Sequence, residues 1–108
     1  MHVQIAARHT EVPEDVQARA RELIEKLERF DADVLSAEVV FEEEKHRRKV
    51  EGILSVANSE PVVATGESGE WLNAVDQLAD RLGRMLRRRR GRQRERQARA
   101  AVQEFGTE

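Results

Sequence analysis

The spacing of apolar residues changes several times along this chain, and these changes limit the folds that it can adopt. Residues 2–7 alternate polar and apolar side chains, which is typical of a half-buried strand. From Val16 to Phe30, apolar side chains recur every three or four residues, the pattern of a helix with one buried face. Pro13 occupies a first helical position, and acidic residues follow it in the first turn. The pattern predicts a helix that ends near Phe30.

Two further alternating segments follow, at residues 37–42 and 50–57, and each predicts a strand; after a turn at 58–61, residues 62–65 predict a fourth. The charged run at 42–49 lies between the first two and predicts a hairpin centred on Lys45 and His46. A second helix is predicted from Glu70 onward. Its apolar stripe consists of Leu72, Val75, Leu78, Ala79, Leu82, Met85 and Leu86.

The order of these elements predicts an α+β fold with the sequence β-α-β-β-β-α. The helical crossover favours parallel pairing of the first two strands, whereas the short connections favour an antiparallel meander for the other strands. We therefore expect a four-stranded mixed sheet with both helices packed on one face. Aromatic residues make up only 4% of the chain, so its core must be mainly aliphatic.

The composition excludes several classes of function. The chain has no cysteine, which excludes disulfides and thiolate metal sites and fits a reducing compartment. Apolar runs are short and no basic-then-apolar leader is present, so we expect a cytoplasmic protein that does not span a membrane. Its three histidines lack metal-ligand spacing, and no Gly-rich phosphate loop or nucleophile motif occurs. We expect no enzyme activity, no cofactor and no small-molecule substrate.

Charge is segregated along the chain, although the net charge is only −2. Residues 1–70 carry a net charge of −7, and residues 71–108 carry a net charge of +5. Within residues 81–99, ten arginines face a single acidic residue, Glu95. Such a basic segment is typical of polyanion binding, since the planar guanidinium donates two parallel bonds to a phosphate. A solubilising tail is the alternative, but it would mix the two signs of charge.

The arginines fall into two groups on the second predicted helix. Arg81, Arg84 and Arg88 share the side opposite the apolar stripe, while the arginines from Arg87 onward crowd around Gly91. We therefore divide the chain into an α+β domain at 1–90 and a basic, flexible C-terminal extension at 91–108. Few aromatics are available for stacking, so structured RNA, recognised by backbone and shape, fits better than a single strand.

Three segments carry a resemblance to a known family. They are residues 11–14 (Glu-Val-Pro-Glu), 26–30 (Lys-Leu-Glu-Arg-Phe) and 70–76 (Glu-Trp-Leu-Asn-Ala-Val-Asp). With the basic ridge that follows them, they resemble the short ribosome hibernation-promoting factors and ribosome-associated inhibitors over nearly all of residues 1–90. The family's tyrosine falls at Leu72, with Trp71 beside it.

The resemblance implies the same β-α-β-β-β-α fold and a ribosomal partner. It implies binding to the small ribosomal subunit and its ribosomal RNA at the decoding region, which would block messenger and transfer RNA. We expect the chain to be monomeric off the ribosome. Arg81, Arg84 and Arg88 match basic family positions that face ribosomal RNA, and Lys26 matches a basic position on the first helix. The adjacent arginines Arg87, Arg89 and Arg90 complete the predicted RNA-binding set.

Two other interpretations remain open. The basic segment could coat structured RNA or DNA without a fixed ribosomal site. Alternatively, the second helix could serve as a basic amphipathic segment for a protein partner or a membrane surface. The need for its apolar stripe in the core weighs against the membrane version.

Overall fold

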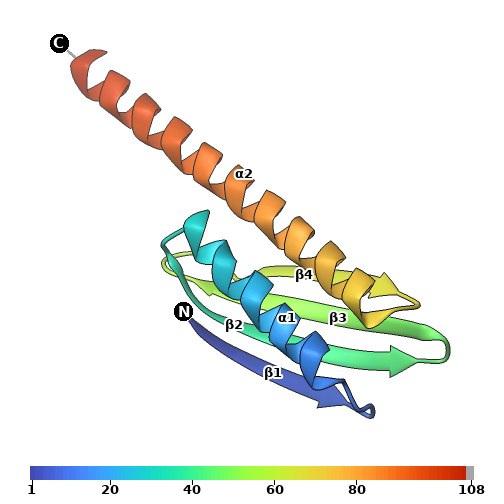
Figure 1. The fold of residues 1–108 in the computed structure, drawn as a ribbon. Coiled ribbons are helices and arrows are strands. Elements are labelled where there is room, and N and C mark those ends of the chain that lie inside the picture. Colours follow the sequence, from blue (N-terminus) through green and yellow to red (C-terminus); the bar gives the residue numbers. More distant parts are fainter. Residues whose placement is uncertain (107–108) are drawn as a thin grey trace.

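The computed structural model describes the backbone of residues 1–106 and the side chains of residues 1–92. Its elements follow the predicted order (Figure 1). They are β1 (His2–Arg8), α1 (Glu14–Glu25), the 3₁₀ turn η1 (Lys26–Arg29), β2 (Val34–Glu44), β3 (Arg47–Val56), β4 (Val62–Ser68) and α2 (Trp71–Gly106). The predicted fold class is confirmed.

The four strands form one sheet in the order β1-β2-β3-β4. β1 pairs with β2 in parallel, and the other two pairs are antiparallel. α1 and α2 lie on the same face of the sheet and run in the same direction (Figure 1). The predicted hairpin is present, with Glu44 opposite Arg47 and Glu43 opposite Arg48.

The end of the first helix differs from the expectation. The α-helix stops at Glu25, and the tighter turn η1 follows it. In a 3₁₀ turn each residue rotates about 120° instead of about 100°, so four residues rotate the chain by roughly 80° more. Leu27 remains buried, but Phe30 is 40% exposed, outside the buried stripe in which the sequence placed it.

The core between sheet and helices is mainly aliphatic, as the composition requires. The Trp71 ring packs edge-on against Phe41, with 5.5 Å between the ring centroids. Trp71 is 4% exposed, whereas Leu72 is 45% exposed, so the assignment of Leu72 to the buried stripe is wrong. The stripe starts one residue earlier because the larger indole ring fills the space against Phe41. Leu78, Leu82 and Leu86 are buried as predicted.

The first turns of α2 approach β4 so closely that their backbones are in contact. A Cβ atom on Gly66 would lie 1.9 Å from the carbonyl oxygen of Ala74. Only glycine fits at this position, and its presence fixes the distance between α2 and the sheet.

α2 continues past Gly91 without interruption and projects beyond the sheet (Figure 1). The protein is therefore elongated, with principal extents of 63 × 23 × 18 Å. Where the sequence predicted a flexible extension, the backbone at 91–106 is helical. Arginine, glutamine and alanine are good helix formers, and one glycine costs only about 1 kcal/mol. The division of function between residues 1–90 and 91–108 stays a prediction.

Candidate nucleic-acid interface

The outer side of α2 carries a row of exposed arginines. We call Arg81, Arg84 and Arg88 the α2 ridge. All three are exposed, since the opposite side of α2 supplies the buried stripe. Seven residues separate the first from the last, which corresponds to about 10 Å along the helix axis.

Each ridge arginine has a different environment. Arg81 donates through Nη1 to the carbonyl oxygen of Thr65 on the edge strand β4. Arg84 pairs with Asp80 one turn earlier, with 2.8 Å between Nη2 and Oδ2. Arg88 has no ion-pair partner among the described side chains. Exposed ion pairs contribute only about 0–1 kcal/mol, so Asp80 holds Arg84 only weakly against a competing phosphate.

Arg89 faces inward, unlike its neighbours in the predicted RNA-binding set. Its guanidinium forms an ion pair with Asp31, whose side chain is fully buried, and also lies 3.7 Å from Asp33. The side chain of Arg89 is only 13% exposed. Arg90 adds a contact of 4.0 Å to Asp33. These pairs attach α2 to the loop between η1 and β2.

Arg87 and Lys26 are held at the two sides of a groove between the helices. The guanidinium of Arg87 lies over the Phe30 ring, 5.0 Å from its centroid, and its Nε donates to the carbonyl oxygen of Gly83. The ammonium of Lys26 is 3.1 Å from Glu22. The hydrogen bond and positive charge of Lys26, with the charge of Arg19, lower the pKa of Glu22 below its ordinary value of 4.5.

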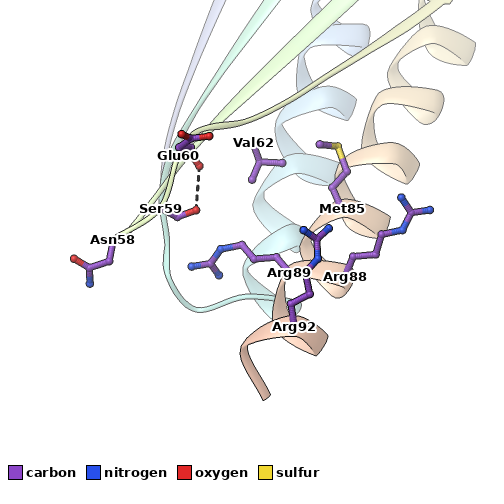
Figure 2. A pocket seen from close by; sticks show the side chains of 8 residues that line it. All are labelled: Asn58, Ser59, Glu60, Val62, Met85, Arg88, Arg89 and Arg92. Carbon is purple, nitrogen blue, oxygen red and sulfur yellow. Dashed lines mark hydrogen bonds between the residues drawn. The ribbon is translucent and has the colours of Figure 1, made fainter. Parts of the chain in front are cut away.

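A second basic feature lies where α2 passes the loop between β3 and β4. Figure 2 shows this pocket, which has a volume of 490 Å³. Arg88, Arg89 and Arg92 border it on the α2 side, and Asn58, Ser59 and Glu60 border it on the loop side (Figure 2). The guanidinium groups of Arg88 and Arg92 outnumber the one carboxylate of the lining, that of Glu60, while Arg89 is paired with Asp31. The sequence did not link the loop to the arginines, because the two are about thirty residues apart and only tertiary packing brings them together.

The remaining arginines of the basic segment, Arg94, Arg96 and Arg99, have side chains outside the described residues. In the described part of the chain, no group of three or more His, Cys, Asp or Glu side chains is arranged to hold a metal ion. Nor does any helix there have the length and apolar composition needed to cross a membrane.

The fold and the charge define a small α+β domain with one long helix whose outer side is basic. The chain belongs to the family described as Sigma 54 modulation protein / S30EA ribosomal protein, whose model matches residues 3–94. Because this match covers most of the chain, the resemblance found in the sequence is confirmed.

Two curated relatives support the same assignment. The chain is 35% identical over 97 residues to the ribosome hibernation promoting factor of Azotobacter vinelandii, and the match covers 90% of each chain. It is 31% identical over 93 residues to the factor of the same name from Pseudomonas putida, covering 86% of this chain and 90% of the relative.

Two solved structures share the fold. A ribosomal subunit interface protein from Coxiella burnetii matches 84% of this chain and 99% of its own, with a TM-score of 0.78 at 16% identity. The N-terminal domain of Protein Y from Thermus thermophilus matches 82% of this chain and 98% of its own, with a TM-score of 0.73 at 20% identity.

Proposed function

We propose that this chain is a ribosome hibernation factor that binds the decoding region of the small ribosomal subunit. The observation that carries the proposal is the exposed α2 ridge, found in a chain that shares nearly its full length with named ribosome hibernation promoting factors. Occupancy of the decoding region would prevent messenger and transfer RNA from binding, and would thereby inhibit translation without catalysis.

The proposed contacts are between guanidinium groups and ribosomal RNA phosphates. Arginine is suited to this role because its rigid fork donates two parallel charge-assisted hydrogen bonds. The α2 ridge would supply the central contacts, and Arg87, Arg90 and Lys26 would extend them toward the sides of the helix. Phosphate contacts position a protein on RNA without identifying bases, so the shape of the whole domain would select the site.

Arg89 has a different role in this proposal. Its contact with Asp31 uses much of its hydrogen-bonding capacity and leaves it mostly buried. We assign it to holding α2 in the orientation that presents the α2 ridge, with its remaining exposed surface at the pocket of Figure 2.

Sedimentation with separated ribosomal subunits tests the proposal. We expect saturable one-to-one binding to the small subunit and reduced binding of transfer RNA to that subunit. Non-saturating binding to any structured RNA or DNA would instead show a general nucleic-acid module. Retention only by lipid vesicles or by a protein partner would show an interaction module.

A further inference from the structure

A groove runs between α1 and α2 on the side of the helices that faces away from the sheet. Its volume is 350 Å³, enough for one planar heterocycle and its sugar. Leu23, Leu27, Phe30, Ala79 and Gly83 form its apolar surface. The sides of the groove carry charged groups from both helices, namely Lys26, Arg29, Asp76, Asp80 and Arg87.

The groove exposes a ring and a guanidinium plane next to each other. Phe30 is 40% exposed because η1 rotates it out of the core. Phe41 and Trp71, the other Phe and Trp side chains that the structure describes, are buried. The guanidinium of Arg87 lies 5.0 Å from the centroid of the Phe30 ring. Unpaired bases of RNA stack on aromatic rings and on arginine planes, and here the two kinds of side chain lie together at one site.

At the floor of the groove lies Gly83, which is buried and has no side chain. A Cβ atom on Gly83 would lie 3.6 Å from the Phe30 ring and 3.8 Å from Leu27, which is ordinary van der Waals contact. An alanine would therefore fit without displacing a neighbour, so the fold does not require glycine for steric reasons. Glycine in a helix costs about 1 kcal/mol relative to alanine, and here it leaves space beside an exposed ring.

The distribution of charge in the groove fits a nucleotide better than an apolar ligand. Lys26, Arg29 and Arg87 line the groove together with Phe30, and their positive charges would attract a phosphate. Asp76 and Asp80 lie toward the N-terminal end of α2, and their carboxylates would accept hydrogen bonds from the amino groups of a base. Lys26 and Asp80 already have ion-pair partners in Glu22 and Arg84, but an apolar protein segment would offer no polar partner to Arg29 or Asp76.

We propose that this groove binds one unpaired nucleobase of the RNA, stacked against Phe30 and Arg87, with its phosphate near Lys26 and Arg29. The inference rests on the proposed function, since it takes RNA as the partner. It adds a stacking contact that the phosphate-binding ridge does not provide and that, unlike a phosphate contact, releases no counterions.

Two variants test the groove without changing the charge of the protein. Gly83→Leu fills the floor, and Phe30→Leu removes the ring while it keeps an apolar side chain. Gly83→Ala and Leu35→Ala are the matched controls, because alanine fits at position 83 and Leu35 is an exposed apolar residue outside the groove. Thermal melting checks that each variant is folded, and Phe30→Leu gives a second reading of the groove if Gly83→Leu overpacks the contact between the helices.

The first measurement is the affinity for small ribosomal subunits across a salt series. Loss of one stacked base corresponds to about a 5- to 150-fold weaker affinity. The slope of log affinity against log salt should become shallower by no more than about 0.7–0.9 in either groove variant, because at most the one phosphate near Lys26 and Arg29 is lost with the base. The two alanine controls should bind small subunits as tightly as the wild type. If both groove variants also bind that tightly, the groove proposal is wrong and the proposed function stands.

The second measurement uses an RNA hairpin with one bulged 2-aminopurine nucleotide, whose fluorescence falls when the base stacks. We expect the wild type to quench this probe and to bind it more tightly than a fully paired hairpin with the same number of phosphates. Gly83→Leu should show neither effect. This result together with no affinity for small subunits would support the groove and overturn the ribosomal function. Equal affinity of the wild type for the two hairpins would overturn the groove.

Discussion

The guanidinium of Arg89 forms an ion pair with the buried carboxylate of Asp31, which lies 58 residues earlier in the chain. The same carboxylate accepts a hydrogen bond from the backbone N–H of Asp33, at 3.0 Å. Asp31 therefore connects α2 to the loop that follows η1, at the point where α2 begins to project beyond the sheet. The pair therefore links the basic part of α2 to the rest of the domain.

Removal of Arg89 should destabilise the fold. Arg89→Ala leaves the Asp31 carboxylate buried without its cation, and breaking a buried pair in this way costs about 3–5 kcal/mol. Equilibrium unfolding in urea should show this loss in the free energy of unfolding. Arg88→Ala is the control, because Arg88 is exposed and its loss should change stability by about 0.5 kcal/mol or less. Equal stability of the two variants would show that the pair does not hold α2.

A pair of substitutions tests the orientation of the α2 stripe. Leu82→Asp places a charge at a fully buried position, at a cost comparable with the whole stability of a domain, so the variant should unfold. Leu72→Asp makes the same chemical change at a position that is 45% exposed and should remain folded. Circular dichroism and melting separate the two. A folded Leu82→Asp protein would mean that α2 packs with another face.

The contrast between Leu72 and Leu82 shows what the sequence can predict. The order of elements, the parallel crossover and the hairpin pairing follow from local periods, connection lengths and facing charges, and all of them were predicted. The choice between Trp71 and Leu72 depends on Phe41, which comes from another strand. A helical wheel shows only the residues of one helix, so it cannot reveal a contact with a strand.

The roles of the site residues show the same limit. Residues 87–90 are four consecutive arginines, and only their tertiary contacts distinguish them. Arg89 forms an ion pair with Asp31, whereas the guanidinium of Arg87 lies over the ring of Phe30. The position of Phe30 itself depends on the change from α-helix to 3₁₀ turn at Lys26, which the 3.6-residue period does not reveal. The groove was missed for this reason.

Charge reversal of the α2 ridge should abolish association with ribosomes. The variant changes all three ridge arginines to Glu, which replaces phosphate attraction with repulsion. Its melting should remain close to wild type, since each exposed substitution costs about 0.5 kcal/mol or less. The control reverses Arg8, Arg19 and Arg47, which are also exposed but lie away from the outer side of α2. Sedimentation with small subunits should retain the control and lose the ridge variant. Wild-type binding by a folded ridge variant would rule out the ridge as the site.

Glu22 should compete with RNA for Lys26. Glu22→Gln removes the carboxylate that lies 3.1 Å from the ammonium of Lys26, so the ammonium becomes available to a phosphate. We expect tighter binding to small subunits at low salt and a steeper salt dependence, by about 0.7–0.9 in slope for one added contact. Glu25→Gln is the control, because it removes an equal charge from the same helix without changing the pair of Glu22 and Lys26. If both variants show the same gain in affinity, the gain comes from reduced nonspecific repulsion and not from release of Lys26.

The same pair also predicts a direction for the effect of pH. The pKa of Glu22 is lowered in the folded protein, so the stabilising effect of its pair with Lys26 is present above the ordinary value of 4.5. It is lost as the pH falls through the lowered pKa. The melting temperatures of the wild type and of Glu22→Gln should therefore converge as the pH falls through this range. A constant difference between the two melting temperatures would contradict a stabilising pair between Glu22 and Lys26.

The projecting end of α2 should add affinity but no selectivity. Truncation after Arg90 removes four arginines, at positions 92, 94, 96 and 99. If all four contact phosphates, the slope of log affinity against log salt should become shallower by about 3, because each contact releases about 0.7–0.9 counterions. Affinity should be lower throughout, with the largest loss at low salt. Preference for the small subunit should survive, since the α2 ridge and the shape of the domain select the site.

A full-length variant with the same four arginines changed to glutamine separates charge from helix length. Truncation leaves Arg89 in the last turn of α2, where the final carbonyl groups lack partners, and so loosens the pair with Asp31. The glutamine variant keeps that turn inside the helix and changes only charge, so its slope should fall by about the same amount without loss of thermal stability. An unchanged slope in the glutamine variant would mean that these arginines stay in water on the ribosome. Loss of the preference for the small subunit would mean instead that the projecting end of α2, and not the ridge, selects the binding site.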